Sequence, residues 1–216
     1  MSSIKKVDTS FEIKSMGIDF YVPFLVILIA ILYTCFSPSL DIIQYTSRIL
    51  EFVVCPIAAW WSMYLFLDYY EDRASELLFS YPVSTLFHGI IRVTVFFLLF
   101  LVAFFILLLV ITFKYPYVSL VNLAVLYIPQ TVLYCYLGFF LMVLSRNITV
   151  PLLILVAYVA MKYWTMGDRL FPLYNVMSFS IDMQLYPRII YLAIKNVALA
   201  LVLAVIGHFI LARRKI

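Results

Sequence analysis

The stretch 68–84 reads DYYEDRASELLFSYPVS and separates two long segments that are almost free of charge. Four of the chain's eleven acidic residues fall within it, at Asp68, Glu71, Asp72 and Glu76. Charged side chains of this density belong in water, whereas the flanking segments are rich in residues that favour lipid. The stretch therefore predicts a connector at a membrane face, between two segments that cross the membrane.

The composition of the whole chain supports a membrane location. Of its 216 residues, 66% are hydrophobic and only 12% are charged, whereas a soluble domain has about 25% charged residues. Aromatic residues reach 18%, as interfacial belts require. We therefore predict an all-α, multi-pass protein of the cell membrane with a single domain, 1–216. The net charge of +4 comes from scattered basic residues, which argues against a nucleic-acid partner.

Apolar runs predict six transmembrane helices, because a hydrocarbon core of about 30 Å needs roughly 20 apolar residues. The first run follows a polar lead of nineteen residues without a small-residue cleavage site, so we expect a retained span and not a signal peptide. The predicted spans are 20–36, 49–67, 91–113, 118–144, 149–165 and 189–211.

The basic residues predict that both termini are cytoplasmic, under the positive-inside rule. In that orientation the inner side holds nine of them: Lys5, Lys6, Lys14, Arg73, Arg92, Arg146, Arg213, Arg214 and Lys215. The outer side holds five: Arg48, Lys114, Lys162, Arg169 and Arg188. The outer connector, 166–187, is too apolar for a free loop, and we expect an interfacial or re-entrant helix pair there.

Few residues in the spans could carry chemistry. Lys195 lies within the sixth span, where it either snorkels to the interface or takes part in transport. Gln130 and Thr131 follow Pro129 in the fourth span, as part of a translocation path or as partners of the carbonyl that the proline frees. Glu51 is expected to form an exposed pair with Arg48 on one helix face.

Catalytic patterns are absent from the sequence. The histidines are isolated, no nucleophile motif occurs, and the five glycines are too dispersed for a phosphate-binding loop. Cys35, Cys55 and Cys135 lie in apolar runs and are expected to act as small hydrophobic residues. The chain is therefore predicted to be a non-catalytic membrane subunit without a cofactor or metal of its own.

The connector itself has the pattern of a short amphipathic helix. Asp68 and Glu71 have capping-box spacing, acidic residues crowd the first turn, and Pro82 ends the helix. Ala74 begins an apolar face that continues through Leu77, Leu78 and Tyr81. This pattern fits either a surface helix without a partner or a helix that docks a soluble protein.

A resemblance favours docking. Glu76-Leu77-Leu78 followed by Pro82-Val83-Ser84, after the second of six spans, resembles the type-2 ATP-binding-cassette (ABC) transporter permease family. Family members often have Gly-Thr where this chain has Ala74-Ser75, and the next basic residue here comes only at Arg92. The similarity in layout extends over the whole chain, including the termini and the apolar segment before the last span.

The resemblance implies that the connector is a coupling helix, which inserts into a separate ABC ATPase subunit. That subunit would bind ATP and Mg²⁺, and two permease chains, identical or related, would form the path for a hydrophobic or amphipathic substrate such as a peptide, drug or lipid. The docking residues that the resemblance implies are Glu71, Asp72, Arg73, Glu76, Leu77, Leu78, Phe79, Tyr81 and Pro82.

Two other classes fit the same composition. A partner-free secondary transporter or channel needs a charge inside the membrane for coupling, and Lys195 is the candidate in the spans as predicted. A membrane scaffold or immunity protein without transport needs no such group. The presence or absence of an ATPase partner separates the permease from both.

Overall fold

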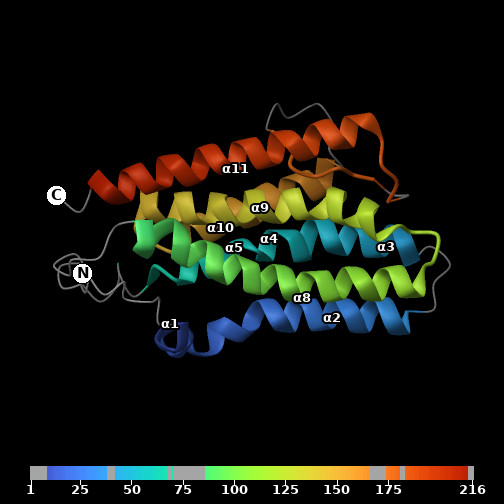
Figure 1. Cartoon of the computed structure of the whole chain (residues 1–216), viewed down its shortest axis with the longest axis horizontal. Coiled ribbons are helices and arrows are strands. Elements are labelled where there is room, and N and C mark those ends of the chain that lie inside the picture. Colours follow the sequence, from blue (N-terminus) through green and yellow to red (C-terminus); the bar gives the residue numbers. More distant parts are fainter. Residues whose placement is uncertain are drawn as a thin grey trace, which may run out of the picture.

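A computed structural model of the chain describes residues 9–37, 42–67, 70, 86–165, 174–180 and 183–213. All regular secondary structure within these residues is helical. The longer helices run roughly alongside one another (Figure 1). The elements are α1 (Thr9–Met16), η1 (Gly17–Tyr21), α2 (Val22–Phe36), α3 (Ile42–Ile49), η2 (Leu50–Val54), α4 (Cys55–Ile57), α5 (Ala59–Tyr64), η3 (Phe87–Ile91), α8 (Arg92–Lys114), α9 (Leu120–Ser145), α10 (Thr149–Thr165) and α11 (Pro187–Arg213).

Four helices among the described residues are long and apolar enough to cross a membrane. They correspond to the first, third, fourth and sixth predicted spans. Their bounds are Glu12–Phe36, Gly89–Lys114, Leu120–Ser145 and Pro187–Arg213. The fifth predicted span, 149–165, is the apolar helix α10, which has 17 residues. The structure thus confirms an all-helical, membrane-embedded chain over the part that it describes.

The second predicted span, 49–67, is not one regular helix. It is a segmented run in which α3 leads into the π-helical turn η2, followed by α4, a turn at Ala58 and α5. Pro56 contributes to this break because it has no N–H for a helical hydrogen bond. A π-helical turn also rotates the side chains that follow it relative to a regular helix, and such turns are frequent at functional sites.

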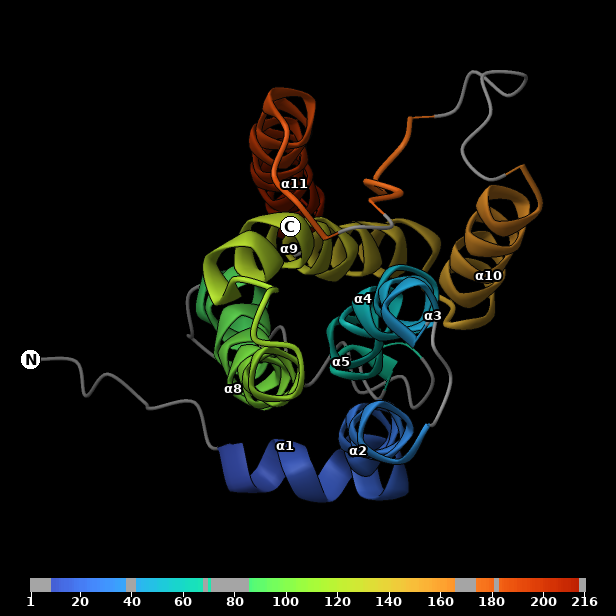
Figure 2. The same ribbon diagram turned by 90° about the vertical axis from the view of Figure 1, so that its right-hand side faces the viewer.

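Helix α9 lies at the centre of the bundle. It contacts α4, α5, α8, α10 and α11, and its buried face includes the large side chains Tyr127, Tyr134 and Phe139. Figure 2 shows α11 beyond α9 on the side away from α2. Close approach of α5 depends on Gly138, because a Cβ atom at that position would lie 2.6 Å from Ser62 Oγ and 2.9 Å from Ala59 Cβ.

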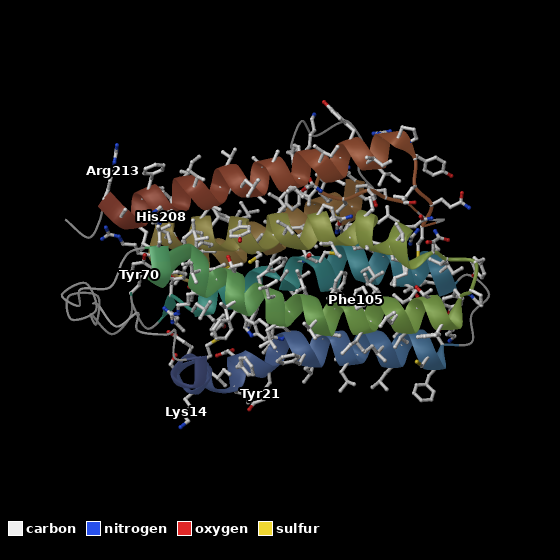
Figure 3. All side chains as sticks on the ribbon, viewed as in Figure 1. Lys14, Tyr21, Tyr70, Phe105, His208 and Arg213 are labelled. Atoms are coloured by element: carbon white, nitrogen blue, oxygen red, sulfur yellow. The ribbon has the colours of Figure 1, made fainter. Side chains whose placement is uncertain are left out.

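Helix α1 lies across the end of the bundle, at an angle to α2 (Figure 2). Gly17 makes this bend with a φ of 56°, a conformation that glycine adopts without a steric penalty. Two indole groups fasten the bend, since Trp60 Nε1 donates to Asp19 O and Trp61 Nε1 to Phe20 O, both at 3.0 Å. Figure 3 shows Lys14 and Arg213 toward this same end of the molecule, on opposite sides of the bundle.

Candidate functional site

The most unusual group inside the bundle is the carboxylate of Glu51, on the π-helical turn η2. Glu51 is only 2% exposed. Its Oε1 atom accepts hydrogen bonds from the backbone N–H groups of Ser178 and Phe179, each at 3.0 Å, and from Ser178 Oγ. Gln130 Nε2 approaches the same oxygen at 3.5 Å. A buried carboxylate is costly unless donors surround it, and here every one of these partners is a donor.

This arrangement corrects the expectation for Glu51. The sequence suggested an exposed ion pair with Arg48 on one helix face, but the carboxylate points into the bundle and binds a segment 127 residues later in the chain. Glu51 lies at helical spacing from Ser47, Leu50 and Val54, which are all buried, so its side chain shares their inward face and cannot lie on an exposed one.

The partner segment, residues 174–180, connects α10 towards α11 without helical structure. It therefore differs from the helix pair that we expected for 166–187, of which residues 166–173, 181 and 182 lie outside the described part. Val176 and Met177 are buried against the bundle. Phe179 has a φ of 52°, which is rare for a residue with a side chain and is maintained only by surrounding contacts.

Hydrogen bonds from α3, α10 and α11 also hold this segment on the bundle. Ser47 Oγ, on α3, donates to Ser180 O at 2.9 Å. Tyr158 Oη, on α10, donates to the carbonyl of Tyr174 at 2.8 Å and accepts from the N–H of Val176 at 3.0 Å. These bonds satisfy backbone groups that a bilayer could not.

Helix α11 completes the attachment through Asn196. Its Nδ2 donates to Val176 O at 2.9 Å, and its Oδ1 accepts from Tyr174 Oη at 2.8 Å. Segment 174–180 is therefore bound to α3, η2, α10 and α11 at once, which makes it part of the bundle and not a free loop.

The predicted path residues are found in two separate places. Gln130 is buried and joins the Glu51 cluster, and it also donates to Leu126 O at 2.9 Å. Thr131 is buried and donates to Ile128 O at 2.8 Å, so both side chains bond carbonyls of the helix around Pro129. Lys195 is exposed on α11, with its ammonium group 4.6 Å from the centroid of the Tyr191 ring. The structure does not bring Lys195 together with the other two.

The nine residues predicted to dock an ATPase, together with the coupling helix that they form, lie outside the described part of the chain. The segment that contains them connects α5 to η3. Figure 3 shows Tyr70 at the end of the bundle that also holds Lys14 and Arg213. The chain therefore leaves the bundle near Tyr70 and re-enters it at η3, both at the end where α1 lies.

An apolar groove of about 410 Å³ lies between the segmented second run and α10. Its walls are almost entirely apolar and rich in aromatic rings. Residues that line it include Phe52, Pro56, Trp60, Leu155, Tyr163 and Trp164. Such a surface suits an apolar or amphipathic molecule, and it offers no charged group for an ion.

The sequence interpretation did not predict the burial of several charged residues, among them Glu51 and Lys162, which lie in predicted spans. Lys162 was assigned to the outer side, yet it is 2% exposed on α10, with its ammonium group 5.9 Å from the Tyr158 ring centroid. For both residues, an ionisable side chain inside an apolar run indicated a buried charge. Because each lies near the end of a predicted span, the sequence interpretation placed it in water. One cysteine also differs from expectation, because Cys35 is exposed while Cys55 and Cys135 are buried.

No protein-family model, curated protein or solved structure matches the chain.

Proposed function

We propose that the chain is the transmembrane permease subunit of an ATP-driven ABC exporter, with six spans and cytoplasmic termini. The observation that carries the proposal is the Glu76-Leu77-Leu78 and Pro82-Val83-Ser84 pattern in the connector between α5 and η3. A coupling helix must face the same side of the membrane as the ATPase. Support comes from the shared position of α1, the end of α11 and Tyr70 at one end of the bundle (Figure 3).

In this proposal the chain supplies the path and its partner supplies the energy. A separate ATPase chain binds ATP with Mg²⁺, and its closure moves the docked connector. The connector is continuous with α5 and η3, so its displacement is transmitted to the segmented second run and to α8. A second permease chain, identical or related, completes the path.

The groove between the second run and α10 supports a hydrophobic or amphipathic cargo. Trp60 and Trp164 present large aromatic surfaces there, and Phe52 and Tyr163 meet edge to face with their centroids 5.2 Å apart. Peptides with apolar side chains, lipids and many drugs bind to surfaces of this kind, whereas a hydrophilic polymer would find few hydrogen-bond partners.

The decisive experiment changes the connector and leaves the bundle intact. The double variant Glu76→Lys with Leu77→Asp is purified from its own membranes, and the eluate is assayed for Mg²⁺-dependent ATP hydrolysis and for a nucleotide-binding chain. We expect the wild type to bring both, and the variant to lose both while staying in the membrane. ATPase association that survives the double change contradicts docking at this connector.

A matched control reverses the same kinds of charge on the predicted outer side. Asp168→Lys with Leu170→Asp is expected to retain the ATPase, because the proposed topology assigns these residues to the outer connector. Loss of the partner in this control would show that the assay reports general damage and not docking.

One observation favours a second candidate, a partner-free secondary transporter. The buried Glu51 carboxylate is an intramembrane charge of the kind that ion-coupled transport uses. That mechanism predicts transport in vesicles without ATP, collapse of transport with the ion gradient, and loss of coupling in Glu51→Gln. Transport that requires both ATP and an unaltered connector would favour the exporter.

A further inference from the structure

The Glu51 cluster and the apolar groove share a boundary. The Phe179 ring meets the Phe52 ring at 62° with 5.8 Å between centroids, and Phe52 in turn meets Tyr163. Phe52 and Tyr163 both line the groove. The Phe179 ring therefore packs against Phe52, a residue of the groove wall, and connects segment 174–180 to that wall.

The backbone of Phe179 depends on Glu51. Its N–H group donates to Glu51 Oε1, and its positive φ needs contacts that maintain it. Ser178 adds two more donors to the same oxygen atom. The Glu51 Oε1 atom thus anchors the stretch of backbone that carries the Phe179 ring.

We infer that Glu51 is a positioning residue that fastens segment 174–180, here named the strap, so that the Phe179 ring closes the groove wall behind Phe52. Release of the strap from Glu51 opens the groove to water at that place. The other fastenings, through Ser47, Tyr158 and Asn196, keep the strap on the bundle while its Phe179 end moves. This inference goes beyond the proposed function, since it holds for any occupant of the groove and needs no ATPase.

The first measurement is hydrogen–deuterium exchange of the full-length protein in lipid nanodiscs. In Glu51→Ala, the amides of Ser178 and Phe179 lose their acceptor, and their exchange is expected to rise about tenfold or more. Glu51→Gln keeps an acceptor oxygen in place and is expected to restore most of the protection. Thr94→Val, which removes a 3.0 Å contact with Tyr136 elsewhere in the bundle, is the matched control and is expected to leave the strap unchanged.

The second measurement reports on the groove. Lipid covers the flank of the groove in a nanodisc, so a membrane-impermeant thiol reagent enters from an end. In a Cys35→Ser background, a Val159→Cys reporter in the groove is expected to react several-fold faster with Glu51→Ala than without it. Phe179→Ala removes the ring but keeps its N–H, and is expected to accelerate labelling without loss of strap protection.

Equal exchange of the strap in wild type and Glu51→Ala overturns the inference. If Glu51→Ala instead loosens α9 as well, Phe179→Ala decides, and unchanged labelling in that variant overturns closure by the ring. Absence of an ATPase partner would contradict the proposed function, but it would change neither the hydrogen–deuterium exchange of the strap nor the thiol labelling of the groove.

Discussion

The guanidinium of Arg92 and the carboxylate of Glu12 form an ion pair at the end of the bundle where α1 lies. Arg92 is buried at the first position of α8, with its Cζ 5.7 Å from the centroid of the Phe66 ring. The pair therefore ties α1 to α8, next to the last described residues of the segmented second run. Since η3 and α8 follow the connector, the same contact links α1 to the element into which the connector leads.

Removal of the negative charge of Glu12 is expected to destabilise the protein. Glu12→Gln leaves the buried guanidinium of Arg92 without a carboxylate partner in α1, at a cost of roughly 1–4 kcal/mol, between the values for exposed and fully buried pairs. Thermal unfolding in detergent measures the effect. Lys14→Gln, on the same helix but exposed, is the matched control, and equal melting temperatures for the two variants would contradict a stabilising pair.

Lys114 is expected to contribute to stability at the opposite end. Its Nζ donates to the carbonyls of Thr34 and Cys35, two acceptors that the end of α2 leaves without helical partners. Lys114→Met should cost about 1 kcal/mol, because the site is partly exposed. Lys195→Met, at an exposed lysine whose ammonium group lies near the Tyr191 ring, should cost less, and the reverse order would contradict capping of α2.

Two glycines on the central helices are expected to tolerate alanine differently. Gly138→Ala brings a methyl group to 3.0 Å from the backbone oxygen of Ala59, which cannot move without shifting α5, so we expect a cost of about 1–3 kcal/mol. Gly207→Ala meets the edge of the Phe139 ring at 2.8 Å, and a side chain can move aside more easily. Denaturation in detergent compares them, and a smaller loss for Gly138→Ala would refute tight α5–α9 packing.

A bulky residue in the groove is expected to block cargo. Val156 lines the groove and is 66% exposed, and Val156→Trp fills that space. We expect the variant to lose substrate stimulation of ATP hydrolysis in the purified complex, while basal hydrolysis persists. Val102→Trp changes an equally exposed valine on α8, outside the groove, and should retain stimulation. Equal stimulation in both variants would place the cargo elsewhere.

The sequence was informative where hydrophobicity alone determines structure. The predicted span 91–113 corresponds to α8, and 149–165 has the bounds of α10, because a long apolar run in lipid has no alternative to a helix. The break in the second run was not predictable in detail. Pro56 is compatible with a break in the helix, but a π-helical turn has no composition of its own.

The polar cluster was missed for a different reason. Glu51 and Ser178 are 127 residues apart, and nothing in either local sequence indicates that they meet. Only the folded backbone brings Ser178, Phe179 and Gln130 to one oxygen atom. The apolar character of 166–187 argued against a free loop, and residues 174–180 are bound to the bundle by hydrogen bonds. They are irregular chain, however, and not the expected helices.

The length of α10 has a consequence for the surrounding lipid. Its 17 residues rise about 26 Å, which is less than the roughly 30 Å of a hydrocarbon core. Helices α8, α9 and α11, with 23 to 27 residues, have no such deficit. In the proposed six-span layout, the bilayer therefore thins beside α10, or polar headgroups lie closer to the groove than elsewhere on the perimeter. An amphipathic molecule that leaves the groove sideways would meet the membrane where its barrier is narrowest.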